Sequence, residues 1–389
     1  MILTARRAVT AFAALAVPAS LVLAGPAATA SPGGAHPQPG FTVMQIVNGM
    51  KLQHHYTVSG TRKTEPLSGP DDLTNFGPFL FTAFQNGVGS QGEPSTDGNT
   101  NSTIVAFTPS GHVLRQWDIK GKCDGLTADP VLRRLIATVN EDGNSSLYTI
   151  DPLARTGGIQ HYAYNKPLPH NGGTDAITIY NGQIFISASA PGTTGAPAPQ
   201  PTYPAVYSVA LGTDHVATIT PLFGDEATAT IANIGPSHGT RVKLALIDPD
   251  SNFAVPSGAP RFAGAFELTS QADKQQIYMQ TQDGAVRLRV LNLSQAVDDT
   301  AWVTGHGLLF ATDGDGDTVS RVSGDFKAGS IFVAATPCDA GNAPPTCPAP
   351  GFPPNYLGML GPWTGHVSKV ALSGPRLEPK GLLFLPTGH

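Results

Sequence analysis

The sequence predicts an all-β fold: a β-propeller of six blades, with seven as the alternative, preceded by an N-terminal signal peptide. Three observations lead to this prediction. Helical periodicity is almost absent after residue 30, short β-rich segments alternate with turns of glycine, asparagine and aspartate, and similar units recur roughly every fifty residues. A repeat of that length, holding about four strands, is typical of a propeller blade.

The strands are expected as a series of hairpins. The clearest hairpin pairs residues 135–139 with 146–151 across a turn at 140–144. The other expected strands lie at 104–107 and 112–119, 183–187, 205–209 and 217–220, 276–279 and 286–291, 308–312 and 318–322, and 356–359 and 367–371. A last apolar strand at 381–385 is expected to close the ring. Three insertions interrupt the pattern, at 87–102, 192–202 and 336–354.

Four polar residues recur at corresponding places, and we interpret each as opening an apolar strand that leads into a hairpin. They are Asn75, Asp124, Asp175 and Asp299. Their intervals are 49, 51 and 124 residues, and the last interval fits two units with insertions. Because the innermost strands of a propeller surround a central channel, we expect these side chains to converge on one mouth of that channel.

The first thirty residues have the pattern of a secretory signal. Arg6 and Arg7 precede an apolar run over 8–23, and Ala28-Thr29-Ala30 offers a small-residue cleavage site. A membrane anchor is the alternative, but the apolar run is short for a bilayer span and is interrupted by Pro18. The protein is therefore predicted to be secreted.

After the signal we expect a disordered leader over 31–40 and a single propeller domain over 41–389. The formal net charge is −5, and it becomes −7 (21 basic against 28 acidic residues) once the two arginines of the signal are removed. Nothing is basic enough to indicate nucleic-acid binding. The expected protein is a monomer without a membrane span, and a small molecule or a glycan is a possible ligand.

The three cysteines fit an exported protein. Cys338 and Cys347 bracket a Pro-rich loop, and a disulfide between them would restrict that insertion. Cys123 is then left over. A buried thiol is the favoured interpretation and a reactive thiol is the alternative.

One segment carries a resemblance to a known family. Asp124-Gly-Leu-Thr-Ala-Asp-Pro130, the strand at 136–139, the Asn/Gly turn and Leu147-Tyr-Thr-Ile-Asp151 resemble a blade of the NHL-repeat and gluconolactonase-like propellers. The match is good over 122–190, fair over 73–121 and 296–325, and weak over 212–265. The resemblance implies a secreted bacterial member of that superfamily.

The resemblance also implies a catalytic divalent metal, with calcium the expected ion, held at the channel mouth by Asn75, Asp124, Asp175 and Asp299. Clustered carboxylates would repel one another unless a hard cation lay among them. The glutamate of the family pattern has no counterpart here. The alternative is that these residues cap strand ends. His170, five residues before Asp175, is a candidate general base at the same mouth, or else a surface histidine in a turn.

Two other motifs have competing interpretations. Gly235-Pro-Ser237-His238-Gly239 matches the G-x-S-x-G motif of serine esterases, but that motif needs a following helix and the sequence predicts a strand there. Asp313, Asp315 and Asp317 alternate as in a calcium loop, yet the loop lacks the closing glutamate, which favours a solvated turn.

Two functions follow from these residues. The first is a divalent-metal-dependent hydrolase of lactones or esters that acts at the central channel. The second is a non-catalytic extracellular module that binds a glycan, a peptide or an envelope partner on its loop-rich rim. A serine esterase using Ser237 is the third and least favoured.

Overall fold

The computed structural model describes residues 40–387 except 170–171, 190–202 and 283–284. Residues 39–389 form one compact unit. The predicted signal peptide (1–30) and all but the last residue of the leader (31–40) lie outside the described residues. Within the described part, no helix is long and apolar enough to cross a membrane.

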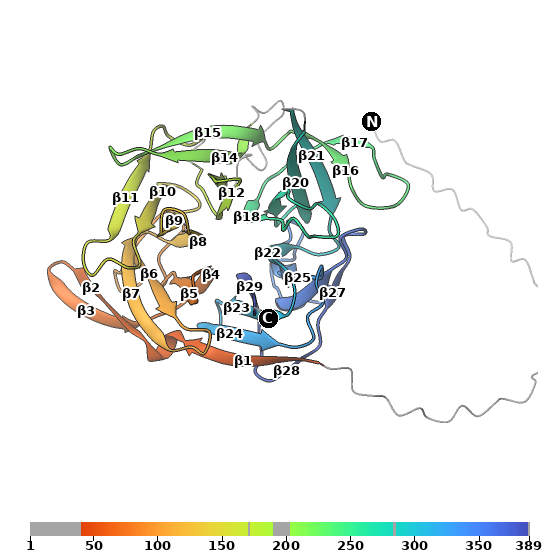
Figure 1. The fold of residues 1–389 in the computed structure, drawn as a ribbon. Helices are drawn as coiled ribbons and strands as arrows, with labels where there is room; N and C mark the ends of the chain where they lie inside the picture. Colours follow the sequence, from red (N-terminus) through yellow and green to blue (C-terminus); the bar gives the residue numbers. More distant parts are fainter. Residues whose placement is uncertain (1–39, 170–171, 190–202, 283–284, 388–389) are drawn as a thin grey trace, which may run out of the picture. The chain divides into compact units, whose positions relative to one another are not determined.

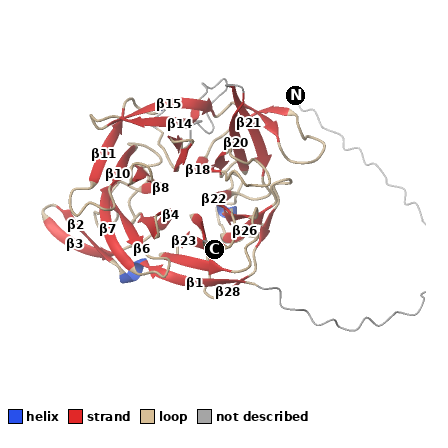
Figure 2. Ribbon diagram, viewed as in Figure 1, coloured by secondary structure: helices blue, strands red, loops and turns tan. Residues whose placement is uncertain are grey.

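Six blades, each with a core of four strands, surround a central axis (Figures 1 and 2), so the predicted six-bladed propeller is confirmed. Blades 2 and 3 are joined at their outer strands into one eight-stranded sheet. The first three blades follow the chain in order. Blade 1 contains β4 (Pro70–Phe76), β5 (Phe79–Phe84), β6 (Asn101–Phe107) and β7 (Val113–Lys120). Blade 2 contains β8 (Cys123–Asp129), β9 (Arg134–Val139), β10 (Ser146–Ile150) and β11 (Ile159–Tyr164). Blade 3 contains β12 (Ile177–Tyr180), β13 (Gln183–Ser187), β14 (Pro204–Leu211) and β15 (Val216–Gly224).

The other three blades are less regular. Blade 4 contains β18 (Pro249–Ala254), β19 (Phe266–Ser270), β20 (Gln275–Gln282) and β21 (Ala285–Asn292), and is extended by β16 (Thr228–Ile231) and β17 (Arg241–Lys243). Blade 5 contains β22 (Val297–Trp302), β25 (Ile331–Ala335), β26 (Tyr356–Leu360) and β27 (Val367–Lys369). Blade 6 contains β29 (Leu382–Pro386), β23 (Gly307–Asp313), β24 (Thr318–Ser323), β1 (Phe41–Asn48) and β28 (Leu372–Ser373). A hairpin of β2 (Gln53–Val58) and β3 (Thr61–Pro66), and the 3-10 turns η1 (Gly49–Lys51) and η3 (Pro337–Asp339), lie outside these sheets.

Both ends of the described chain contribute to blade 6, which closes the ring. The C-terminal β29 pairs with β23, so the predicted closing strand is confirmed, and the N-terminal β1 pairs with β24 on the outer side. The chain leaves blade 5 after β22, forms β23 and β24 of blade 6, and returns to blade 5 as β25. The predicted hairpin at 308–322 therefore exists, but it belongs to the blade that holds the two ends of the described chain.

The core consists of six hydrophobic clusters, one between each pair of neighbouring blades. Successive side chains of one strand point to opposite faces. In β5, for example, Phe81 packs toward blade 2 while Leu80 packs toward blade 6. Both faces of a blade are thus buried. This explains why a second strand such as β5 or β25 is almost continuously apolar where a half-exposed sheet would alternate.

Candidate active site in the central channel

A small cavity of about 40 Å³ lies where the innermost strands of the blades converge. Most of its lining residues are acidic. The lining residues are Asp71, Asp72, Asp124, Glu141, Asp175, Ala176, Asp250, Ser251, Asn252, Asp298, Asp299, Lys380 and Gly381. A volume of this size holds about one water molecule or one ion.

Each blade places at least one charged residue at this cavity, and one of these lies at or just before the start of the innermost strand. In blade order these residues are Asp71, Asp124, Asp175, Asp250, Asp298 and Lys380. Four of the innermost strands (β4, β8, β18 and β22) have a register shift at this position. Such a bulge bends the strand and redirects a side chain out of the regular ladder, here toward the channel.

In blades 1 and 5, the residue that follows the channel-facing aspartate joins its blade to the next blade. Asp72 accepts a hydrogen bond over 2.7 Å from the backbone N–H of Leu126 in blade 2. Asp299 accepts one over 2.6 Å from the N–H of Leu382 in blade 6. These two carboxylates therefore have a structural role in addition to facing the cavity.

Burial raises the pKa of most carboxyl groups in this cluster. Burial and the charge of Glu141 raise the pKa of Asp124 well above the usual range. Burial and the charge of Asp250 do the same to the pKa of Asp175. Burial also raises the pKa of Asp299 to about 7, while the N–H groups of Leu382 and Thr300 oppose the shift. A desolvated carboxylate surrounded by like charges favours its protonated form, unless a cation compensates the charge.

Two lysines and one amide offset part of the charge. Lys122 contacts both Asp124 (2.9 Å) and Glu141, and Lys380 lies 2.7 Å from Asp71. Burial would lower the pKa of each lysine, but the neighbouring aspartates raise it, so both stay protonated. The Gln85 side-chain amide bridges blades 1 and 2 by donating to Asp71 and, over 2.9 Å, to Asp124.

Two buried oxygen atoms of the cavity lining have no hydrogen-bond donor among the described residues. They are Oδ2 of Asp124, a residue 4% exposed, and Oδ1 of Asn252, which is 8% exposed. Carboxylate oxygens and the carbonyl oxygens of amides are the ligands that hard cations such as calcium prefer. Within the described part of the chain, however, no three His, Cys, Asp or Glu side chains come together as a ready-made metal site. A cation here would therefore need amide or backbone oxygens as well as carboxylates.

Three of the four predicted site residues, Asp124, Asp175 and Asp299, lie together at the cavity. Asn75 does not line it. It lies near the end of β4, where its side-chain amide donates to the Gly77 carbonyl, and Asp71 and Asp72 at the start of that strand face the channel instead. The expected alignment was wrong there because Asn75 ends the strand that it was expected to open. The candidate base His170 lies outside the described residues.

Several residues of the cavity did not appear in the sequence interpretation. They are Asp71, Asp72, Glu141, Asp250, Asn252, Asp298 and Lys380. A usable signal was present: an aspartate followed by a small or acidic residue begins the inner segment of five blades, as in Pro70-Asp71-Asp72 and Pro249-Asp250-Ser251.

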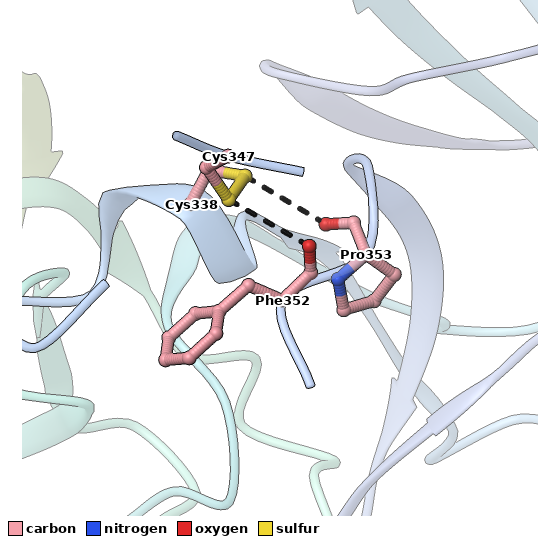
Figure 3. Close-up of a disulfide and its surroundings, with 4 residues drawn as sticks. All are labelled: Cys338, Cys347, Phe352 and Pro353. Carbon is pink, nitrogen blue, oxygen red and sulfur yellow. Dashed lines mark hydrogen bonds between the residues drawn. A yellow bond between two sulfur atoms is a disulfide. The ribbon is translucent and has the colours of Figure 1, made fainter. Parts of the chain in front are cut away.

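Both expectations for the cysteines are confirmed. Cys338 and Cys347 form a disulfide (Figure 3), and their sulfur atoms lie 3.9 Å and 3.6 Å from the carbonyl oxygens of Pro353 and Phe352. Cys123 is fully buried between blades 1 and 2.

The remaining motifs are structural turns. Ser237 is exposed in a turn segment, and the short strand β17 follows it where the esterase motif would need a helix. Asp313 accepts hydrogen bonds from the N–H groups of Gly316 and Glu378, and Asp317 accepts one from Gly69. These carboxylates thus cap backbone groups in a turn, as expected, but Asp313 is buried, Asp317 is half-buried, and only Asp315 is exposed to solvent.

Comparisons with known proteins find similar folds among solved structures. No protein-family model and no curated protein matches the sequence. Among solved structures, the chain is similar to a periplasmic gluconolactonase of Pseudomonas aeruginosa (15% identity, 89% of this chain and 99% of that chain, TM-score 0.42). It is also similar to a proposed 6-phosphogluconolactonase of Bacteroides fragilis (11%, 89% and 98%, 0.41) and to hydrazine synthase of Kuenenia stuttgartiensis (13%, 78% and 66%, 0.40). The propeller assignment rests on the strand order of this chain.

Proposed function

We propose that this protein is a secreted hydrolase of lactones or esters that acts at the acidic end of its central channel with the help of a divalent cation. One observation supports the cation above all. Oδ2 of Asp124 and Oδ1 of Asn252 are buried without a donor among the described residues, in a cavity of ion size ringed by carboxylates.

Asp124, Asp175 and Asn252 are the side chains that would hold the cation, and calcium is the ion that fits their hard oxygen atoms. A divalent cation bound there would polarise a substrate carbonyl and lower the pKa of a coordinated water. The protein itself supplies the negative charge that attracts the ion, and Lys122 and Lys380 limit that charge.

Asp299 is the described residue best suited to exchange a proton. Its pKa of about 7 is close to neutral pH, where a general acid or base works best, and two backbone N–H groups fix its carboxylate. Lys380 stays protonated beside Asp71 and orients that carboxylate. The role of His170 as a general base remains part of the proposal.

A second candidate, the non-catalytic extracellular binding module, is favoured by one observation. A cavity of about 40 Å³ admits an ion or a water but no organic substrate, so a lactone would have to bind outside it. In this alternative, a bound cation would only stabilise the packing of the innermost strands around the channel.

Export and the absence of nucleic-acid partners belong to both versions of the proposal. The disulfide is typical of proteins that fold outside the cytosol and supports secretion. The acidic net charge gives no attraction for nucleic acid. We propose that the mature protein is a monomer and that its ligand is a small molecule or a glycan.

A thermal melt of the mature protein in calcium, in EDTA and in calcium restored after EDTA tests the cation. We expect a reversible rise of about 5 °C with calcium, because an ion that binds only the native state stabilises it by mass action. Asp175→Asn should remove most of that rise, and Asp325→Asn, at an exposed site, should leave it intact. An identical melting temperature in all three conditions would contradict the proposal that the protein binds a cation.

A panel of sugar lactones and aryl esters then tests catalysis. Turnover that EDTA abolishes and calcium restores would support the hydrolase. A calcium-dependent melt without turnover of any panel member would overturn the hydrolase and leave the binding module.

A further inference from the structure

Two adjoining hollows lie over the outer part of blade 2, on the side of the turn at 140–145 away from the channel cavity. Their volumes are about 600 Å³ and 630 Å³, and they share Gln91, Asn144, Ser145 and Ala163 in their lining. They therefore form one continuous groove, which we call the blade 2 groove. Unlike the channel cavity, it has room for an organic ligand of several rings.

The insertion at 87–102 forms one wall of this groove because it docks on blade 2. The N–H of Asp142 donates to the Ser90 carbonyl over 3.1 Å, and the Asn144 amide donates to the Gln91 carbonyl over 3.2 Å. The floor is equally fixed. Asn140 is buried, accepts from the N–H of Lys122 over 2.9 Å, and donates to the Asn144 carbonyl over 3.1 Å.

The charge of the blade 2 groove is opposite to that of the protein. The chain has 28 acidic and 23 basic residues, yet the described residues that line the two hollows include Lys120, His161 and Lys166 and no carboxylate. Burial and, to a smaller extent, the nearby Lys120 lower the pKa of His161, so its imidazole is neutral at neutral pH. The positive charge of the groove therefore belongs to Lys120 and Lys166, and an anion in the groove could pair with both.

The other lining groups fit hydroxyl-rich rings. The side-chain amides of Gln91, Asn144 and Asn165 can each donate and accept, as vicinal hydroxyl groups require. Tyr148 provides an aromatic face, with its ring centroid 4.8 Å from that of His161, and both line the same hollow. Aromatic rings present apolar area with little loss of entropy on binding.

We propose that the blade 2 groove binds an acidic oligosaccharide, with uronate carboxylates paired to Lys120 and Lys166 and sugar hydroxyls paired to the amide side chains. This site is separate from the channel cavity. Glu141 lines the cavity, whereas Asn140 and Asn144 of the same turn line the groove. The proposal holds whether or not the channel is catalytic, since it concerns binding alone.

Isothermal titration calorimetry on the mature protein tests this inference with three probes: tetragalacturonate, neutral maltotetraose and a tetraglutamate peptide. We expect tetragalacturonate to bind at least tenfold more tightly than either of the others. The double variant Lys120→Gln/Lys166→Gln should weaken tetragalacturonate binding at least tenfold without changing the melting temperature. Lys327→Gln, at an exposed site outside the groove, is the matched control and should bind normally.

Three results would overturn the proposal. One is the absence of tetragalacturonate binding, and another is equal binding by the double variant, which would place the ligand elsewhere. The third is equal affinity for tetraglutamate or maltotetraose, because the groove would then recognise charge alone or sugar without charge. Tyr148→Leu gives a second check: it should weaken tetragalacturonate and leave the calcium-dependent melt unchanged.

Discussion

The carboxylate of Asp299 accepts a hydrogen bond over 2.6 Å from the backbone N–H of Leu382, 83 positions further along the chain. The same side chain accepts from the N–H of Thr300. Asp299 belongs to blade 5, and Leu382 begins the strand that closes blade 6. One side chain therefore connects the acidic channel to the closure of the ring.

Replacing Asp299 by alanine should destabilise the protein by about 2–3 kcal/mol, because the N–H groups of Leu382 and Thr300 are buried and would lose their acceptor. The measurement is urea unfolding at pH 6, where repulsion among the channel carboxylates is small. Asp325→Ala, at an exposed position, is the control. Equal unfolding midpoints for the two variants would contradict a closing role for Asp299.

Without divalent cations, the protein should be more stable at pH 5 than at pH 8. The folded state raises the pKa of Asp299 from its usual 3.8 to about 7 and raises those of Asp124, Asp175 and Asp298 as well. Between the unfolded and folded pKa values the folded state binds more protons, so the free energy of unfolding falls as the pH rises through that window. We expect the melting temperature to fall by about 5 °C or more in EDTA.

Calcium should reverse this loss at pH 8 and have little effect at pH 5, because protons and the cation compete for the same oxygen atoms. The measurement is a melt at both pH values with and without calcium. Asp124→Asn removes one titrating group and should flatten the pH dependence measured in EDTA. A melting temperature that rises from pH 5 to pH 8 in EDTA would contradict the cluster as the source of the effect.

Hairpins, closing strand and disulfide were predictable from the sequence because each depends on local signals: a turn between two apolar segments, or two cysteines close in the chain. The exchange of strands between blades 5 and 6 was not predictable from the sequence. The hairpin of β23 and β24 has the same local pattern whether it joins blade 5 or a blade built from both ends of the described chain. Only long-range packing decides between them.

Only part of the ring of charged residues was predictable from the sequence, because a bulge changes which side chains of a strand face the channel. Asp71 and Asn75 lie near opposite ends of β4, and a pattern of period two does not show which of the two faces the channel. The register shift after Pro70 decides for Asp71. Lys380 was missed because it lies before β29 where the other five blades have an aspartate.

The native protein should show no free thiol to a water-soluble disulfide reagent, although it contains Cys123. That thiol is fully buried, and burial together with Asp124 raises its pKa well above the usual range, so the reactive thiolate is scarce. The modification rate should be at least about 100-fold lower than in urea, where one thiol per chain should react. Two further thiols would appear only if the Cys338–Cys347 disulfide were absent.

Gly173 should be intolerant of even one added methyl group. A Cβ at this position would lie 1.8 Å from the carbonyl oxygen of Glu141 and 2.6 Å from that of Asn140, and backbone atoms cannot yield as a flexible side chain does. The turn at 140–145 would have to move. Because that turn carries Glu141 to the channel cavity and Asn140 to the floor of the blade 2 groove, its displacement should disturb both.

We therefore expect Gly173→Ala to lower the free energy of unfolding by about 3 kcal/mol. It should also reduce the calcium-induced rise in melting temperature by more than half. Gly305→Ala is the matched control, since nothing lies within 4 Å of a Cβ built there and its backbone φ lies outside the left-handed region. If both variants melted and responded to calcium alike, the turn at 140–145 would tolerate the added methyl group and its close packing on Gly173 would not position Glu141 at the cavity.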